Sequence, residues 1–263
     1  MSAKHHQRNP GSQCQANRER NCDHAPPTPC GFSQPKLGDA LKHRFVGWTA
    51  CILSGDARLI EAFHSGEDIH RHTAAEVLGI ARDEVTPDQR NSAKAVNFGI
   101  VYGQTPYGLA QQLGISTEEA ASFIARYFER YEGVRRFIES SLSAARETGV
   151  TRTMFGRIRQ HPEINSKNGL RRSMAERTAI NSPIQGTAAD IIKLAMIHIA
   201  AELQRAKLRT RMVLQVHDEL IFEVPKEELE VRNMIAEKMQ NVVQLSVPLT
   251  VAVKQGLSWS SLE

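Results

Sequence analysis

The residues His217, Asp218 and Glu219 carry the most concentrated chemistry in this sequence. Apolar stretches at 211–216 and 219–224 flank them, a pattern that predicts two strands joined by a two-residue turn. Carboxylates at the end of an apolar hairpin cost free energy unless they bind cations or hydrogen-bond donors. Their hard oxygen atoms suit Mg²⁺, which usually takes one or two protein carboxylates and keeps several waters. An acidic turn that is merely solvated at a sheet edge has the same sequence, so the turn alone leaves both interpretations open.

A second chemical pattern is a stripe of residues spaced by four: Arg90, Lys94, Phe98 and Tyr102. This spacing keeps the four side chains on one face of a predicted helix over 90–102. Arg and Lys can hold a triphosphate, and aromatic faces can stack on a nucleobase. A solvated basic patch beside core aromatics is the alternative interpretation. The stripe therefore indicates either a nucleotide-binding face or an ordinary helix surface.

The elements that must position these residues follow from hydrophobic periodicity and capping signals. Ser54, Gly55 and Asp56 indicate a helix start, and Ser116 with Glu119 forms a capping-box pattern that opens a long helix. The predicted helices also cover 90–102, 169–181, 187–207 and 226–244, and the predicted strands cover 211–216, 219–224 and 248–253. Together these elements predict an α+β body with a small antiparallel sheet.

The composition limits the classes of protein that remain. With 263 residues, of which 41% are hydrophobic and 24% charged, the chain can bury a core. No apolar run approaches the roughly 18 to 20 residues of a membrane span, and no secretory signal opens the chain, so we expect a cytoplasmic protein without membrane association. The formal charge of +4 is concentrated in residues 1–52, which carry 7 Lys and Arg against 3 Asp and Glu. Nucleic-acid binding by the remaining residues must depend on how charge is arranged.

The first part of the chain differs in character from the rest. Residues 1 to about 38 are rich in Pro, His and polar residues without an apolar period, which predicts disorder. The four cysteines, Cys14, Cys22, Cys30 and Cys51, lack the Cys-x-x-Cys pairing typical of zinc sites. An organised domain is predicted from Leu53 onward.

Four motifs in the same order resemble those of family A DNA polymerases, the bacterial DNA polymerase I type. They are the fingers-helix motif at 90–103, the palm metal motif at 215–220, and two further matches at 68–70 and 176–190. The resemblance runs from about Leu53 to Trp259. It implies an α+β fold with helical fingers and a small antiparallel palm sheet, in an incomplete polymerase domain that lacks the thumb. The implied division is a disordered or out-of-family segment at 1–52, followed by fingers and palm at 53–263.

The resemblance implies a nucleotide-binding role for His70, Arg90, Lys94, Phe98, Tyr102 and Gln104. Arg90 and Lys94 would grip the incoming triphosphate, and Lys94 would protonate the leaving pyrophosphate as a general acid. His70 would lie at the phosphates, Phe98 at the sugar and Tyr102 at the templating position.

The resemblance also implies contacts with the primer–template minor groove through Arg177, Asn181, Gln185 and His217. Asp218 would hold Mg²⁺ with Glu219 assisting, so the implied catalytic residues are Asp218, Glu219 and Lys94. The implied reaction is template-directed DNA synthesis in replication or repair. In this reaction a primer 3′-hydroxyl attacks the α-phosphate of a deoxynucleoside triphosphate (dNTP), and two Mg²⁺ ions stabilise the attacking and leaving oxygens. The implied partners are primer–template DNA and dNTPs, and the chain is expected to act as a monomer.

One part of the family pattern is not met. In the family, a second metal-binding aspartate precedes the segment that matches Leu53 to Asp56, and counting back places Leu41 at its position. Val46 stands where the family has a glutamate that excludes the ribose 2′-hydroxyl, which puts sugar selection in doubt. Asp39 lies two positions from Leu41, but along a strand this shift moves a carboxylate by about 6.5 Å, which argues against substitution. The departure implies impaired catalysis and a palm without its central strand.

Three interpretations of the chain stay open. Its beginning reflects a frameshift or a wrong gene start in a working polymerase, which the change of character near Ile52 favours. Alternatively, the chain is an inactive binder of primer–template DNA, a remnant of a polymerase. A third interpretation is that it folds poorly because hydrophobic faces are left uncovered. A metal-dependent phosphohydrolase built on His217 and Asp218 belongs to another class, and the aromatic rings of the stripe argue against it.

Overall fold

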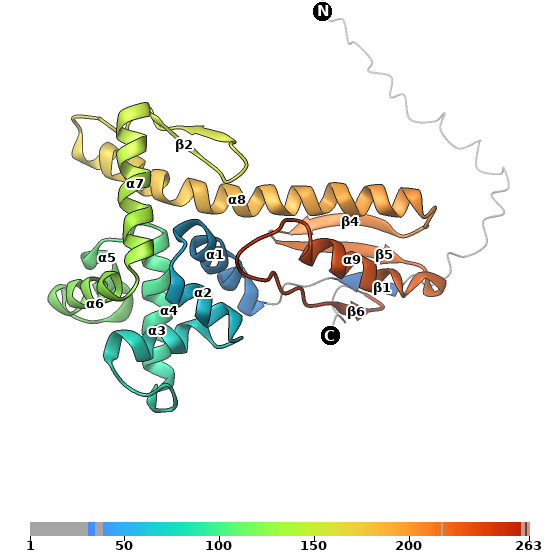
Figure 1. Ribbon diagram of the computed structural model, residues 1–263, viewed down its shortest axis with the longest axis horizontal. Coiled ribbons are helices and arrows are strands. Elements are labelled where there is room, and N and C mark those ends of the chain that lie inside the picture. Colours follow the sequence, from blue (N-terminus) through green and yellow to red (C-terminus); the bar gives the residue numbers. More distant parts are fainter. Residues whose placement is uncertain (1–30, 35–38, 217, 259–260, 262–263) are drawn as a thin grey trace, which may run out of the picture.

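The computed structural model describes residues 31–34, 39–216, 218–258 and 261. A group of helices and a small antiparallel sheet occupy opposite ends of an elongated molecule (Figure 1). The long helix α8 (Gly169–Arg205) extends from the helical end to the end that holds the sheet. The predicted α+β fold, with a large helical part and a small antiparallel sheet, is confirmed.

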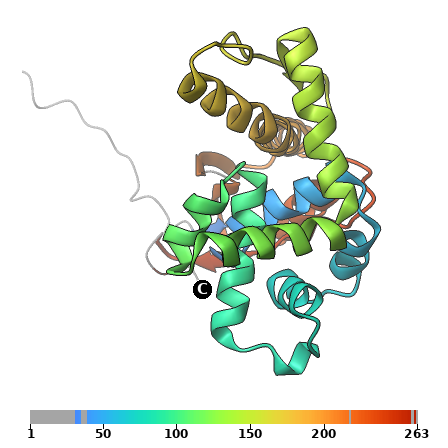
Figure 2. The same cartoon turned by 90° about the vertical axis from the view of Figure 1, so that its left-hand side faces the viewer.

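The elements of the described residues have the following bounds. Besides α8, the helices are α1 (Asp39–Ser54), α2 (Ala57–His64), α3 (Ile69–Leu78), α4 (Pro87–Val101), α5 (Pro106–Leu113), α6 (Thr117–Arg130), α7 (Glu132–Thr148) and α9 (Val231–Gln240), with short 3-10 helices at Arg82–Glu84 and Lys226–Glu228. The strands are β1 (Gly31–Gln34), β2 (Val150–Arg152), β3 (Ile158–Gln160), β4 (Arg211–Val216), β5 (Glu219–Val224) and β6 (Lys254–Gly256). In the end view, α6 crosses in front of α4, and α7 rises toward the N-terminal half of α8 (Figure 2).

Polar caps begin the helices where the sequence predicts them. Ser116 Oγ accepts the Glu119 backbone N–H at 3.1 Å, and the Glu119 carboxylate accepts the Ser116 N–H at 2.9 Å, which is the predicted capping box of α6. Asp56 Oδ1 accepts the N–H groups of Arg58 and Leu59 at 3.2 Å each and caps α2. Both predicted helix starts are therefore confirmed.

Helix α4 begins earlier than the predicted residue 90. Thr86 and Gln89 form a second capping box, and Pro87 occupies the first turn, where its missing N–H has no partner to lose. The stripe of Arg90, Lys94 and Phe98 consequently lies inside a well-capped helix and not at its frayed end.

Helix α8 is continuous where the sequence predicts two helices, at 169–181 and 187–207. Pro183 lies inside it and removes one backbone hydrogen bond, a change that costs about 3 kcal/mol or more in an isolated helix. The helix continues because Ile180, Pro183 and Ile184 are all buried against neighbouring elements. The predicted interruption was wrong because tertiary packing outweighs the local penalty of the proline.

The main sheet has the strand order β4-β5-β1-β6, and every pair is antiparallel. The predicted hairpin is confirmed, because β4 and β5 have the predicted bounds. Strand β1 lies between β5 and β6, with Gly31 opposite Val224 and Gln34 opposite Lys254. The expectation of a palm without a central strand is therefore wrong, as is the predicted disorder over 31–34. Without β1, the edge of β5 that faces away from β4 would leave backbone N–H and C=O groups without partners, and β1 pairs with this edge over residues 222–224.

The C-terminal elements differ in part from their predictions. The predicted helix over 226–244 is shorter, since α9 covers Val231–Gln240 after a separate 3-10 helix. The strand predicted at 248–253 is wrong, because β6 begins at Lys254. Val247 and Val251 are nevertheless buried, so the alternating apolar pattern there marks packing against the core and not ladder pairing.

Helix α1 lies almost wholly inside the segment 1–52 that the sequence separates from the rest. Asp39 and Leu41 both belong to this helix, so the comparison of their positions along a strand was wrong. Trp48 is buried and its Nε1 donates to the carbonyl of Pro248 at 3.2 Å, which joins α1 to the C-terminal part. The division of the chain at residue 52 stays a prediction. The rest of the segment predicted to be disordered, 1–30 and 35–38, lies outside the described residues.

The largest hydrophobic core joins α8 to the sheet and to the helical part. It includes Ile191 and Ile199 of α8, Leu220 and Phe222 of β5, and Met239 of α9. By length and composition α8 is also long and apolar enough to cross a membrane, a test that core helices of soluble proteins pass as well. Here its apolar residues form the common support of both parts of the molecule.

Candidate functional site

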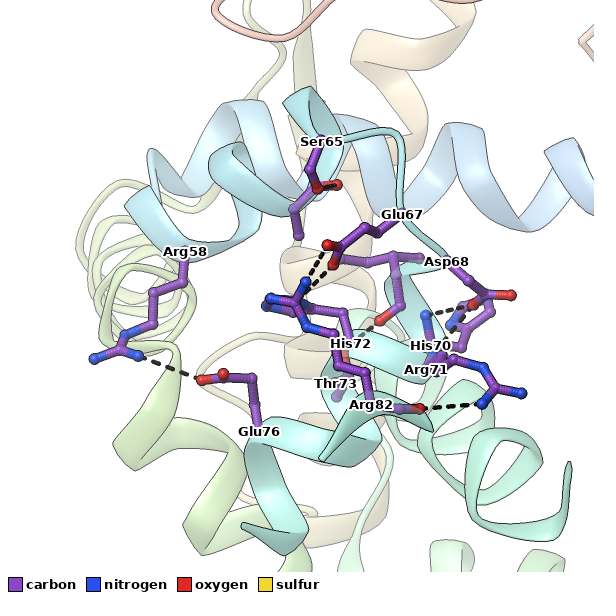
Figure 3. Close-up of polar contacts among 12 residues, drawn as sticks. Arg58, Ser65, Glu67, Asp68, His70, Arg71, His72, Thr73, Glu76 and Arg82 are labelled. Carbon is purple, nitrogen blue, oxygen red and sulfur yellow. Dashed lines mark hydrogen bonds and ion pairs between the residues drawn. The ribbon is translucent and has the colours of Figure 1, made fainter. Parts of the chain in front are cut away.

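Asp68 joins the start of α3 to the first turns of α4. Its Oδ1 accepts the backbone N–H groups of His70 at 2.9 Å and Arg71 at 3.1 Å, and so caps α3 (Figure 3). Its Oδ2 accepts from Arg90 Nε at 2.8 Å and lies 2.7 Å from Arg90 Nη2. Asp68 therefore fixes the guanidinium of Arg90, a role that no local pattern in the sequence indicates.

These contacts keep the Asp68 carboxyl charged. Partial burial is the largest single influence and disfavours the charge, but the Arg90 hydrogen bond, the N–H groups of Arg71 and His70, and the Arg90 charge together outweigh it. The pKa of Asp68 therefore lies below its usual range. A guanidinium has five N–H donors, so the pairing with Asp68 leaves donors on Arg90 for a second anion.

The structure brings together His70 and Phe98, two predicted nucleotide-binding residues from separate helices. The ring centroids lie 5.5 Å apart, with an interplanar angle of 61°. His70 is buried, and its Nδ1 lies 3.1 Å from Asn97 Nδ2. Two consecutive residues of α4 therefore contact the imidazole, Asn97 through its amide and Phe98 through its ring.

Lys94 and Tyr102 extend the same face of α4. Lys94 is half-buried and, within the part of the chain that the structure describes, takes part in no ion pair. Tyr102 ends the helix and its side chain is 40% exposed. Gly103 follows with φ +64°, and a Cβ there would lie 3.3 Å from the Cα of Arg177 and 3.2 Å from Ile180 Cδ1. Glycine thus allows the end of α4 to pack closely on α8.

Gln104, another predicted nucleotide-pocket residue, folds back over the end of α4. Its backbone N–H donates to the carbonyl of Gly99 at 2.7 Å, and its side-chain Nε2 donates to Gln112 Oε1 at 3.1 Å. A Cβ on Gly99 would meet Gln104 Oε1, the end of a flexible side chain, so a larger residue there would displace the Gln104 amide. The Gln104 side chain therefore bridges α4 and α5.

The predicted primer–template residues of α8 follow one another by four positions. Arg177 and Gln185 are exposed and Asn181 is half-buried. Asn181 Oδ1 is buried and has no hydrogen-bond partner among the described residues. Such an orphaned acceptor suits a donor supplied by a ligand.

Arg157 is a basic residue beside this row that the sequence analysis did not select. Its Nε donates to Asp190 Oδ1 at 2.8 Å and its Nη2 donates to the carbonyl of Gly186 at 2.9 Å. Arg157, Arg152 and Gln185 are among the residues that line a cavity of about 200 Å³ between the β2–β3 hairpin and α8. The hairpin that carries Arg157 meets α8 only through tertiary folding, so no periodic pattern could identify this residue.

The palm carboxylates lie at the turn between β4 and β5. Asp218 and Glu219 are each 7% exposed, and both carboxylate oxygens of Asp218 are buried. Among the described residues, no group of three or more His, Cys, Asp or Glu side chains could hold a metal ion. The two carboxylates fit the hard-oxygen preference of one Mg²⁺ ion that also binds waters and phosphates. His217 lies outside the described residues, so its predicted contact stays a prediction.

Ion pairs along α3 anchor the helical part further (Figure 3). Glu67 pairs with Arg82 and contacts His72 Nδ1 at 3.3 Å, while Glu76 pairs with Arg58 at 3.3 Å and with Arg130. The hydrogen bond from Arg130 is the largest influence that lowers the pKa of Glu76. These contacts hold the helix that carries Asp68 and His70 against α2, α6 and the 3-10 helix.

Comparison with known proteins identifies the class to which this fold and site belong. Residues 48–261 match the family model of DNA polymerase family A, and this match begins inside α1. The chain belongs to DNA polymerase family A. Polymerases of this family are generally metal-dependent enzymes.

The similar proteins include bacterial DNA polymerases I. The chain is 52% identical to DNA polymerase I of Bacillus subtilis (strain 168) over 208 residues. This aligned region covers 79% of this chain and 24% of the relative. It is 49% identical to DNA polymerase I of Mycobacterium tuberculosis (strain CDC 1551 / Oshkosh) over 210 residues. This aligned region covers 80% of this chain and 23% of the relative. The chain thus spans about a quarter of the length of the curated relatives it matches.

A solved structure supports the same family. The POL domain of Pol1 from M. smegmatis, in complex with DNA primer-template and dNTP, matches with a TM-score of 0.80 and 44% sequence identity. The match covers 88% of this chain and 40% of that chain. The fold described above is therefore that of part of a polymerase domain.

Proposed function

We propose that this chain binds primer–template DNA and a dNTP through the fingers and palm contacts of a DNA-directed DNA polymerase. The observation that carries the proposal is the face of α4, on which Arg90, Lys94 and Phe98 follow one another by four residues. Asp68 orients Arg90, and His70 packs on Phe98. Two cations followed by aromatic rings suit a triphosphate joined to a base. The M. smegmatis POL domain in complex with DNA primer-template and dNTP supports the choice of ligands.

Each residue of the α4 face has a distinct proposed task. Arg90 binds the triphosphate with the donors that Asp68 does not use, and Lys94 binds it as a point charge. Lys94 also donates a proton to the leaving pyrophosphate oxygen. Phe98 contacts the sugar and Tyr102 stacks at the templating base. His70 donates a hydrogen bond to a phosphate oxygen, and Gln104 lies at the edge of the pocket.

The row on α8 is proposed to follow the primer–template duplex. Arg177, Asn181 and Gln185 would hydrogen-bond to the minor groove, whose acceptors are nearly the same for every base pair. Recognition of this kind tolerates all sequences, as a replication or repair enzyme requires. The chain is proposed to act on DNA as a monomer in the cytoplasm.

Mg²⁺ is the proposed cofactor, held by Asp218 with Glu219 assisting. When bound, Mg²⁺ neutralises the charge that develops on the attacking and leaving oxygens. The protein's own contribution is to keep two carboxylates at the end of the β4–β5 hairpin, largely shielded from water.

Nucleotidyl transfer by this chain is proposed to be impaired. Counting back from the segment Leu53 to Asp56, which resembles the family, places Leu41 where the family has its second metal-binding aspartate. Metal stabilisation of the transition state contributes several kcal/mol, and each 1.4 kcal/mol corresponds to about tenfold in rate. Binding of DNA and nucleotide is expected to persist while turnover falls by orders of magnitude.

The test separates binding from chemistry. Fluorescence anisotropy of a labelled primer–template, measured with this chain over a series of NaCl concentrations, should give an affinity that falls steeply with salt. The dNTP complementary to the template base should tighten the complex, and the three others should not. Primer extension in the same mixture with Mg²⁺ should be slow or undetectable. Template-independent hydrolysis of dNTPs, or the absence of DNA binding, would contradict the proposal.

Variants on α4 assign the nucleotide site. Arg90→Ala and Lys94→Ala should each weaken the effect of the complementary dNTP by about tenfold to a hundredfold, since a charge-assisted hydrogen bond contributes about 1.5 to 3 kcal/mol. Lys226→Ala, an exposed lysine on a 3-10 helix of the palm, is the matched control and should leave nucleotide binding unchanged. Binding with no primer extension at all identifies the chain as an inactive primer–template binder.

A further inference from the structure

The contact between α3 and α4 contains a polar triad of Asn97, His70 and Thr73. Asn97 Nδ2 lies 3.1 Å from His70 Nδ1 and 3.1 Å from Thr73 Oγ1. His70 and Thr73 are buried, with 6% and 0% exposure, and Asn97 is half-buried. A buried triad of this kind restricts which atom carries each proton.

The Thr73 hydroxyl determines the orientation of the Asn97 amide. Thr73 Oγ1 donates to the carbonyl of Ile69 at 2.8 Å, whereas Asn97 Oδ1 lies 3.3 Å from the same hydroxyl oxygen. The hydroxyl proton therefore points to Ile69, and Thr73 Oγ1 accepts from its other neighbours. The Asn97 amide must then turn its NH₂ group toward Thr73, because only nitrogen can donate there.

The orientation of Asn97 in turn determines the tautomer of His70. The NH₂ group has two hydrogens, and the one not directed to Thr73 points to His70 Nδ1. Nδ1 must accept this hydrogen bond, so it carries no proton. The imidazole is then neutral, with its proton on Nε2, and Nε2 is the only donor of the ring.

We propose that Asn97 is a positioning residue that fixes the Nε2–H tautomer of His70, so that His70 donates a hydrogen bond to the triphosphate of an incoming nucleotide. The inference rests on the proposed function, since it assumes that His70 lies at the phosphates. Asn97 itself acts through His70 and not on the nucleotide. Asn97 precedes Phe98 on α4. The helix proposed to bind the nucleotide therefore also carries the residue that orients His70 of α3.

The tautomer is measured directly in the full chain. The protein contains 10 histidines, and long-range ¹H–¹⁵N correlation of ¹⁵N-histidine-labelled protein distinguishes protonated from unprotonated ring nitrogens. His70→Gln identifies the signals of His70 by their loss. We expect wild-type His70 to show an unprotonated Nδ1 and a protonated Nε2. In Asn97→Asp, which offers only acceptors to the ring, Nδ1 should become protonated.

Nucleotide affinity provides the second readout. Asn97→Asp and Asn97→Ala should weaken the binding of the complementary dNTP to the primer–template complex by about threefold to tenfold, while the affinity for DNA alone stays the same. Asn91→Ala, an exposed asparagine on the same helix, should change neither the His70 signals nor the dNTP affinity. Thr73→Ser keeps the hydroxyl and should preserve the tautomer, whereas Thr73→Val should allow both tautomers.

The outcomes separate this inference from the proposed function. If wild-type protein binds the complementary dNTP but His70 carries its proton on Nδ1, or keeps its tautomer in Asn97→Asp, the role of Asn97 is overturned and the proposed function stands. If the wild-type complex binds no dNTP, the proposed function fails and the inference falls with it. The predicted tautomer change together with weaker dNTP binding supports both.

Discussion

The α3–α4 pair and the β4–β5 hairpin carry the two halves of the candidate site, and they are built in different ways. On α3 and α4, the functional side chains are oriented by polar partners on the neighbouring helix, as Arg90 is by Asp68 and His70 by Asn97. At the hairpin, Asp218 directly precedes strand β5 and Glu219 is its first residue, and β5 is held between β4 and β1. The helical half depends on elements close in sequence, whereas the palm half depends on a strand from the other end of the chain.

This difference predicts which substitutions matter to each half. Contacts between adjacent helices form with a small loss of chain entropy, whereas the pairing of β1 with β5 joins residues 31–33 to residues 222–224 and so closes a loop of almost three quarters of the chain. The palm should therefore be the half whose folding fails first when its core is weakened. Four variants test this comparison, from the largest expected effect to the smallest.

Phe222→Ala should produce the largest loss, because Phe222 is fully buried beneath α8 and α9 in the core that supports β5. We expect the free energy of unfolding to fall by about 3 to 5 kcal/mol, measured by urea denaturation with circular dichroism. Hydrogen exchange should show the sheet opening before the α3–α4 pair. Phe155→Ala, at a phenylalanine that is 41% exposed, is the control and should change stability by about 0.5 kcal/mol or less. Equal losses in both variants would contradict the comparison.

Gly133→Ala should destabilise the helical half by a smaller amount. A Cβ there would lie 2.8 Å from the Cα of Asp56, and the Gly133 N–H donates to Asp56 Oδ2 at 2.9 Å. We expect a loss of about 1 to 3 kcal/mol in the free energy of unfolding. Gly47→Ala, inside α1 with no atom within 4 Å of the added Cβ, should instead stabilise the protein by about 0.5 to 1 kcal/mol. A stabilised Gly133→Ala protein would show that Gly133 of α7 and Asp56, which caps α2, lie far enough apart to admit a methyl group.

Arg177→Ala should weaken primer–template binding about fivefold to tenfold and make it less salt-dependent, because it removes a cation from the row on α8 that is proposed to follow the duplex. The fold should be unaffected, since Arg177 is exposed. Anisotropy titrations at several salt concentrations measure both effects. Arg135→Ala removes an exposed arginine from α7 and should leave DNA affinity unchanged. Equal weakening by both variants would show that only net charge matters.

Asp68→Asn should have the smallest effect and one that depends on pH. Burial of Asp68 is the largest single influence on its pKa and raises it. Arg90 and two backbone N–H groups together outweigh burial, so the pKa of Asp68 is lowered in the folded protein. Its contribution to stability is complete above the unfolded-state pKa of about 3.9 and is lost as the pH falls through the lower folded-state pKa.

The asparagine side chain of this variant can still cap α3, so only the ionic part is removed. We expect a loss of less than about 1 kcal/mol at pH 7, because the ion pair is partly exposed, and no difference well below the folded-state pKa. Urea denaturation over a series of pH values measures it. A constant difference at every pH would assign the effect to packing and not to charge.

Much of the local structure could be predicted from the sequence. The capping box of Ser116 and Glu119 and the hairpin around Asp218 depend on residues only a few positions apart, and both are confirmed. The apolar pattern near Val251 was misleading because burial in an extended segment and pairing in a strand require the same alternation. The division of 169–207 into two predicted helices was wrong for another reason: the helix continues through Pro183, because buried packing outweighs the local penalty of the proline.

The sequence by itself determined the kinds of side chain available for chemistry: the spacing of Arg90, Lys94 and Phe98 and the carboxylates of the hairpin turn. These patterns are local, because a helix or a tight turn relates residues within about four positions of each other. Only the tertiary structure decided that Asp68 orients Arg90 across 22 positions, that Asn97 contacts His70 across 27, and that residues 31–34 pair with β5. Such pairings form only when a whole core brings distant segments together, and no pattern along the chain specifies that arrangement.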